Sequence, residues 1–135
     1  MKKKEDRKSK TMAVINRTFD VFLDIIFENG LFFIVIKNNS NNPVFKVKVK
    51  FNNRILGVNG SKEITSLKLF KNIEFLAPQK EIRTFLDTSE SYFSRKQPTR
   101  IITEIFYKDI HNKSHEIVIK HDLEIYRDIG FIIKK

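Results

Sequence analysis

Hydrophobic and polar residues alternate along much of this chain, with the period of two that is typical of a strand facing a core on one side. From residue 19 to residue 28 the odd positions are all hydrophobic, while acidic residues occupy three of the even ones. A helix is the alternative over residues 13–28, because the charged side chains also fit helical spacing. The dipeptide Asn29-Gly30, the strongest short hairpin signal, favours the strand.

A two-residue turn at Asn29-Gly30 also fixes which residues of the two strands face each other. The hydrophobic pairs that follow all point to one side, namely Phe27 with Phe32, Ile25 with Ile34, and Leu23 with Ile36. The same register leaves Phe33 and Val35 on the outer face. There they must meet another element or a partner.

After Pro43 the alternation resumes with lysine at every polar position. The pattern predicts a strand that buries Phe45, Val47, Val49 and Phe51 and exposes Lys46, Lys48 and Lys50. Alternate residues of a strand lie about 6.6 Å apart, so the three ammonium groups repel one another unless an anion or an acidic neighbour lies opposite.

Turn residues divide the rest of the chain into short segments. We expect a loop over 52–63 with a short edge strand near Ile55–Val58, a longer loop over 87–98, and strands over 81–86, 99–108 and 114–125. Residues 64–76 fit either a strand, which we favour, or one or two helical turns. Residues 131–133 suit a last edge strand or a contact with another copy.

About seven strands with turns every 8–12 residues predict an all-β fold, an antiparallel immunoglobulin-like β-sandwich. We assign it to one domain, residues 13–135, preceded by a disordered basic arm, residues 1–12. The expected core contains Val21, Leu23, Ile25, Ile34, Val47, Val49, Ile105, Tyr107, Ile117 and Ile119.

Composition narrows the class of protein. The 135 residues are 41% hydrophobic and include no cysteine, which excludes disulfides and thiolate metal sites. No hydrophobic run reaches the ~18 residues of a membrane span, and no signal-peptide pattern follows the basic start. These features favour a soluble, cytoplasmic protein, although the sequence leaves the location undetermined.

The formal net charge of +10 indicates attraction to nucleic acid, an anionic membrane surface or an acidic protein. Lys46, Lys48 and Lys50, with Lys37 and the basic residues 2–10, could follow a phosphate backbone. Sheets that bind nucleic acid usually carry aromatic residues on the same face, and the alternation puts the phenylalanines of this strand on the other side. We therefore favour an edge strand whose lysines prevent aggregation.

The densest polar cluster is the predicted turn with Asp109, His111, His115 and Glu116. His and carboxylate side chains suit zinc, copper or nickel, but their spacing matches no metal motif, so we favour a simple turn and expect no metal. His121 continues a hydrophobic series and is expected to be a partly buried, hydrogen-bonded strand residue. No motif supplies a base, a nucleophile and an orienting group, so we expect no catalytic residues, cofactor or small-molecule substrate.

Four segments, IKNNSNNPVFKVKVKF, IEFLAPQKEIRTFL, IITEIFYKD and HEIVIKHDLEIYRD, follow one another within residues 31–128. In this order the chain resembles bacterial and archaeal immunoglobulin-like modules of the CARDB and fibronectin type. In those modules an asparagine-rich turn separates two early strands, and a Leu-Ala-Pro-Gly-Glu pattern enters a later one; here Gln79 stands at the glycine. The resemblance implies adhesion, spacing or docking and no catalytic residues.

Two functions remain open from the sequence. The leading hypothesis is a non-catalytic interaction or structural module that meets a protein partner, or its own copies, through a sheet edge. The alternative is a module that binds nucleic acid or an acidic membrane surface through the lysine-lined strand and the basic arm.

Overall fold

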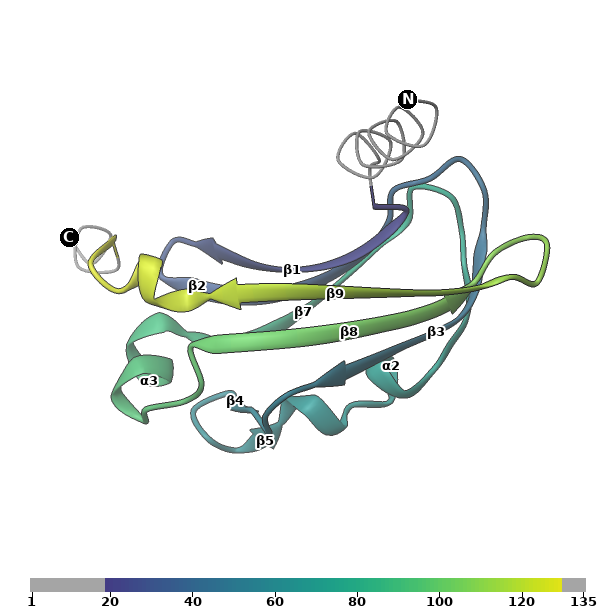
Figure 1. Cartoon of the computed structure of the whole chain (residues 1–135). Coiled ribbons are helices and arrows are strands. Elements are labelled where there is room, and N and C mark those ends of the chain that lie inside the picture. The colour runs from purple at the N-terminus through teal and green to yellow at the C-terminus, as the bar shows by residue number, and fades with distance from the viewer. Residues whose placement is uncertain (1–18, 130–135) are drawn as a thin grey trace, which may run out of the picture.

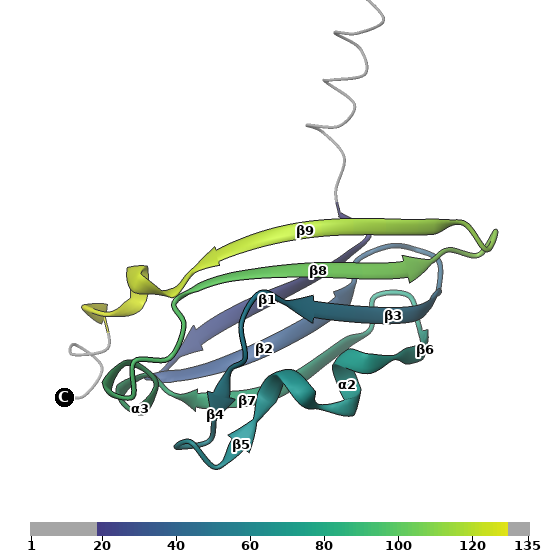
Figure 2. The same cartoon turned by 60° about the horizontal axis from the view of Figure 1, so that its bottom comes forward.

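Two antiparallel sheets packed face to face form the protein, as a computed structural model that describes residues 19–129 shows (Figures 1 and 2). One sheet has the strand order β1-β2-β7, with bounds Val21–Glu28, Leu31–Asn38 and Glu81–Thr88. The other has the order β6-β3-β8-β9, with bounds Ile73–Leu76, Val44–Phe51, Arg100–Lys108 and Ser114–Asp122. The predicted all-β, antiparallel immunoglobulin-like sandwich is confirmed.

Hydrophobic side chains of both inner faces fill the space between the sheets. Eight of the ten predicted core residues are buried, namely Val21, Leu23, Ile25, Ile34, Val47, Val49, Ile105 and Tyr107. The other two, Ile117 and Ile119, are half-buried and pack against this core from β9.

The first hairpin has the predicted turn and register. Asn29 and Gly30 both have left-handed backbone angles, with φ of 51° and 78°, as a two-residue turn of type I′ requires. Glu28 faces Leu31 and every hydrophobic pair stands as predicted. Phe33 and Val35 lie on the outer face of this sheet, where the rings of Phe33 and Phe85 are 5.8 Å apart.

The segment after the turn-rich loop is mostly helical. A 3-10 helix, η1 (Ile64–Ser66), precedes α2 (Lys68–Lys71), and only β6 is a strand. Phe70 is buried while Lys68 and Lys71 are exposed, so α2 covers the flank of β3 with its hydrophobic side. The favoured strand is therefore wrong for residues 64–72 and right for the four residues of β6.

Two further elements differ from the expectation. The loop after β7 contains α3 (Ser89–Ser94), whose first turn is capped because the Thr88 hydroxyl accepts from the Ser91 backbone N–H at 3.1 Å. β9 ends at Asp122, and η2 (Leu123–Tyr126) follows it. The short strand expected in the turn-rich loop is present as β4 (Leu56–Gly57), which pairs with β5 (Lys62–Glu63) in a small ribbon.

Some predictions fall outside the described residues, namely the basic arm and the last hydrophobic segment, residues 131–133. Gln79 takes the left-handed backbone, with φ of 61°, at the position where the resembled modules carry glycine. No helix of residues 19–129 is long and apolar enough to cross a membrane.

Candidate anion-binding face

The lysine-lined strand β3 lies inside its sheet. It is hydrogen bonded to β6 on one side and to β8 on the other. The interpretation of this strand as a sheet edge is therefore wrong. Protection against edge-to-edge aggregation no longer accounts for its lysines, because an interior strand has no free edge to protect.

A β-bulge interrupts β3 at Lys46. The cross-strand pairs on either side of the bulge are Phe45 with Lys108 and Lys48 with Phe106, so β3 has one residue more than β8 between them. Lys46 and Val47 consequently share the single opposite residue Tyr107. Lys46 has a φ of +53°, an angle that non-glycine residues adopt rarely and that bulges can demand.

The bulge reverses the alternation of β3. Val44 and Val47 are both buried although they are three positions apart, so Phe45 lies on the outer face and not in the core. The prediction that both phenylalanines of this strand face away from the lysines is wrong for Phe45. It is right for Phe51, which packs on buried Phe70 with ring centroids 4.9 Å apart.

Lysine and phenylalanine side chains therefore share the outer face of the four-stranded sheet. We call this surface the lysine face and define it by Phe45, Lys46, Lys48, Lys50, Phe75, Phe106 and Lys108. The predicted residues Lys46, Lys48 and Lys50 are all exposed on it. Lys37 is not part of it, because it lies on β2 in the other sheet, opposite Glu81.

The ammonium groups of the lysine face form no salt bridge within the described part of the chain. Within residues 19–129, none of its four lysines has a carboxylate oxygen within 4.0 Å. Lys50 faces Glu104 across the strands, yet its Nζ lies over the Phe106 ring at 5.5 Å from the centroid. The positive charge on this surface is thus left to solvent or a ligand.

Beside the bulge the lysine face is hollowed. A shallow cavity of about 330 Å³ is lined by Lys46, Lys48, Lys108, Phe106, His115 and Glu116, among others. The imidazole of His115 stacks on Tyr107 with ring centroids 4.9 Å apart, and its Nε2 lies 2.8 Å from Asp109 Oδ2. This cavity offers three lysine side chains to an anion of modest size, while the His115 imidazole is engaged by Asp109 and Glu116 adds a carboxylate to the lining.

In the polar turn after β8, the Asp109 carboxylate forms hydrogen bonds within the turn itself. Asp109 Oδ1 accepts from the backbone N–H groups of His111 and Lys113, at 2.8 and 3.0 Å. The hydrogen bond with the His115 side chain is the main reason that the pKa of the Asp109 carboxyl is lowered to about 2, and the hydrogen bond from the Lys113 backbone N–H is the second. No group of three or more His, Asp or Glu side chains that could hold a metal ion occurs in the described part of the chain.

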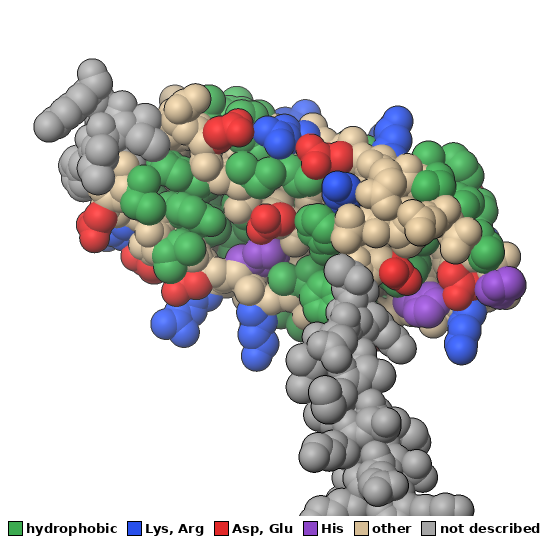
Figure 3. All heavy atoms as spheres, turned by 90° about the horizontal axis from the view of Figure 1, so that it is seen from above, with side chains coloured by type: hydrophobic (Ala, Val, Ile, Leu, Met, Phe, Trp, Pro, Cys, Tyr) green, Lys and Arg blue, Asp and Glu red, His purple; other side chains and the backbone are tan. Residues whose placement is uncertain are grey.

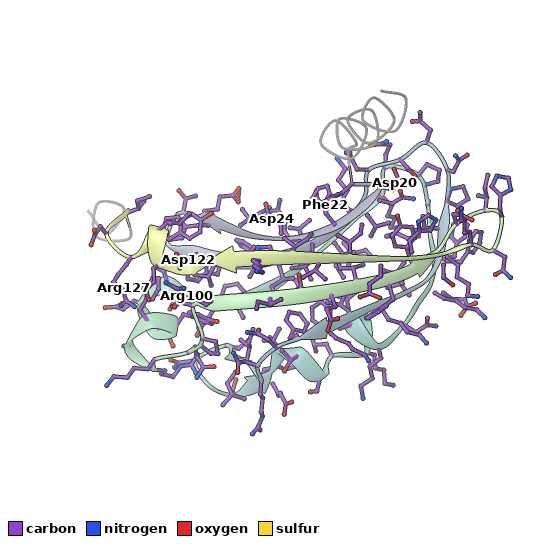
Figure 4. All side chains as sticks on the ribbon, in the orientation of Figure 1. Asp20, Phe22, Asp24, Arg100, Asp122 and Arg127 are labelled. Atoms are coloured by element: carbon purple, nitrogen blue, oxygen red, sulfur yellow. The ribbon has the colours of Figure 1, made fainter. Side chains whose placement is uncertain are left out.

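Charge is balanced at the other end of the same sheet. Figure 4 shows Arg100, Asp122 and Arg127 near one another, and Arg100 pairs in register with Asp122. Arg127 is held by Glu124, with Nε and Nη2 each 2.7 Å from a carboxylate oxygen. Arg127 is paired with Glu124, and Arg100 lies at the opposite end of β8 from Lys108, so neither arginine belongs to the lysine face.

The surface along β1 and β9 has a different character. Acidic and hydrophobic side chains intermingle on it, and Lys and Arg side chains project from both the upper and the lower rim of Figure 3.

Comparison with known families identifies the chain. A family model described as "Domain of unknown function (DUF8453)" matches residues 4–127. The chain belongs to this family. No curated protein and no solved structure matches it. The description of DUF8453 states no ligand or activity, so the function has to be argued from the site itself.

Sequence reasoning missed three members of the lysine face in this DUF8453 chain. Phe75, Phe106 and Lys108 join it from β6 and β8, which pair with β3 only in the folded sheet. The bulge is hard to recognise in the sequence, because residues 45–51 alternate regularly across it. His121, expected to be hydrogen bonded, is half-buried, and its Nε2 is buried without a hydrogen-bond partner within residues 19–129.

Proposed function

We propose that this protein is a non-catalytic β-sandwich module that binds nucleic acid through the phosphate groups, using the lysine face. The observation that carries the proposal is the exposed row of Lys46, Lys48 and Lys50 on an interior strand. Like charges gathered on one face, without a salt bridge to any carboxylate of residues 19–129, favour an external anion. The net charge of +10 adds long-range attraction to the same class of partner.

Salt dependence tests this proposal. About four phosphate contacts on a single strand give an affinity that falls roughly 50-fold between about 50 and about 200 mM salt. Changing Lys46, Lys48 and Lys50 to Ser together should leave a fall of only about 3-fold and much weaker binding at low salt. Fluorescence anisotropy with labelled DNA and RNA measures both quantities.

The matched control changes Lys62, Lys68 and Lys80 to Ser. These lysines are also exposed, and none of them belongs to a strand of the four-stranded sheet. Both triple variants carry the same net charge, so equal losses of affinity would show that the total charge, and not the lysine face, attracts the ligand. Absence of binding by the unmodified protein would refute the proposal.

A protein partner at a sheet edge is the second candidate function. β9 is a nine-residue strand that is hydrogen bonded to β8 alone among the described strands, and Val118 on it is 49% exposed. The resemblance to CARDB and fibronectin modules, which stays a prediction, supports docking of this kind. Edge pairing would depend little on salt, which separates it from the first proposal.

A further inference from the structure

We infer that the lysine face binds single-stranded nucleic acid, with bases stacked on Phe45 and Phe75 and phosphates on Lys46, Lys48 and Lys108. This inference rests on the proposed function and adds to it the strandedness of the ligand and the residues that recognise its bases. The observation behind it is the aromatic pair that the β3 bulge brings onto the basic surface.

The two phenylalanines form a pair at the solvent-facing side of the sheet. Phe45 and Phe75 are direct cross-strand partners on β3 and β6, with ring centroids 5.7 Å apart and planes inclined by 63°. Phe75 is 56% exposed. Exposing such rings to water is unfavourable, and a stacked base removes them from it, which makes aromatic side chains the usual platform for unpaired bases.

Lysines lie next to this pair on two strands. Lys46 follows Phe45 in the chain, and Lys108 stands opposite Phe45 on β8. In a regular strand, adjacent residues point to opposite faces, whereas the bulge lets Phe45 and Lys46 both reach the outer surface. An aromatic platform beside a row of ammonium groups is the arrangement with which proteins hold single strands.

Charges of both signs line the cavity beside the bulge. Among the described residues, Lys46, Lys48 and Lys108 provide ammonium groups and Glu116 provides a carboxylate. The ammonium groups attract a phosphate, and the carboxylate repels it but can accept a hydrogen bond from the amino group of a base. A volume of about 330 Å³ lies at the small end of the range for ligand pockets, as suits one nucleotide.

The shape of the surface favours single strands over duplexes. Within residues 19–129, the outer face of the four-stranded sheet presents no helix or ribbon that could enter a duplex groove. Stacked bases inside a duplex are out of reach of Phe45 and Phe75, whereas the bases of a single strand can turn towards them. A duplex could use the lysines alone.

The test compares two matched double variants of the full chain. Phe45→Thr with Phe75→Thr removes the proposed platform, and Phe33→Thr with Phe85→Thr removes the similar aromatic pair on the outer face of the other sheet. Threonine keeps the preference for strand, and circular dichroism with thermal unfolding checks that each variant is folded. The probes are labelled twelve-residue oligothymidine, a duplex of the same length, inorganic polyphosphate and phosphatidylserine vesicles.

We expect tighter binding to the single strand than to the duplex. Loss of Phe45 and Phe75 should weaken single-strand binding by about 10-fold or more while polyphosphate binding changes less than about 2-fold, and the control pair should change neither. Equal affinity for duplex and single strand, or no effect of the Phe45 and Phe75 changes, overturns the inference and leaves nucleic-acid binding standing. Binding to vesicles alone, or to none of the probes, overturns both.

Discussion

At the scale of single residues, His121 is a polar side chain whose surroundings, within residues 19–129, do not satisfy its hydrogen-bonding capacity. It lies on the inner side of β9, where burial lowers its pKa and the nearby charge of Asp24 on β1 partly opposes this effect. Figure 4 shows Asp24 on β1, the strand that runs beside β9. A neutral imidazole with an unpartnered, buried Nε2 costs stability that a hydrocarbon side chain would not.

His121→Leu should flatten the pH dependence of stability. In the unfolded chain a histidine binds a proton near pH 6.5, whereas the folded state resists protonation of His121, so stability is complete above the unfolded pKa and falls as the pH drops through it. Urea unfolding between about pH 8 and about pH 5 measures this slope. The matched control is His111→Leu, the same change at an exposed histidine. A slope that persists in His121→Leu would contradict the assignment.

At the scale of elements, one buried ion pair fastens the β4–β5 ribbon to the three-stranded sheet. The side chain of Asp87 at the end of β7 is 2% exposed and pairs with Arg95, which also donates to the Leu56 carbonyl at 3.0 Å. Asp87 accepts in addition from the Asn59 backbone N–H. The ribbon and the three-stranded sheet lie so close together at Gly57 that a Cβ on this residue would be 2.2 Å from the Leu86 carbonyl oxygen.

Arg95→Met should therefore destabilise the fold by about 3 kcal/mol, since it leaves the Asp87 carboxylate buried without its cation. Arg54→Met is the matched control. The Arg54 side chain is 68% exposed in its pair with Glu63, and such a surface pair contributes less than about 1 kcal/mol. Urea denaturation of both variants measures the difference. Similar losses for the two would show that Asp87 finds other compensation.

At the scale of the whole molecule, the two outer faces of the sandwich differ in chemistry. The face of the three-stranded sheet is lined by half-buried hydrophobic side chains such as Phe22, Ile26 and Phe33, with Arg83 over the Phe33 ring at 5.4 Å. The face of the four-stranded sheet carries the unpaired lysines. A ligand drawn only by net charge would bind folded and unfolded chains alike, whereas the lysine face exists only in the fold.

Oligonucleotide should accordingly raise the melting temperature. At a concentration of about 100 times Kd, a ligand of the folded state alone adds about 2.7 kcal/mol, which shifts the transition by several degrees in a domain of this size. Differential scanning fluorimetry should show the shift in the unmodified protein and in the Lys62, Lys68 and Lys80 control. It should be small in the Lys46, Lys48 and Lys50 variant. Binding without a shift would indicate attraction to charge alone.

The first hairpin and the fold class were predictable from the sequence because local chemistry specifies them. Asn29-Gly30 accepts the left-handed angles of its turn, and the alternation on either side agrees with the register that this turn imposes. The short helices were less accessible. α3 has a capping signal at Thr88, but η1 and α2 depend on burying Ile64 and Phe70 against the rest of the molecule.

By itself, the sequence determined most of the long strands, the hairpin register and the exposed row of Lys46, Lys48 and Lys50, since each follows from neighbours in the chain. Only the tertiary structure decided that β3 is an interior strand, that a bulge turns Phe45 outward, and that Phe75, Phe106 and Lys108 join the lysines. The physical reason is that these facts depend on which distant strands pair and in what register. The regular alternation of residues 45–51 does not reveal that β3 contains one extra residue, which has no partner of its own on β8.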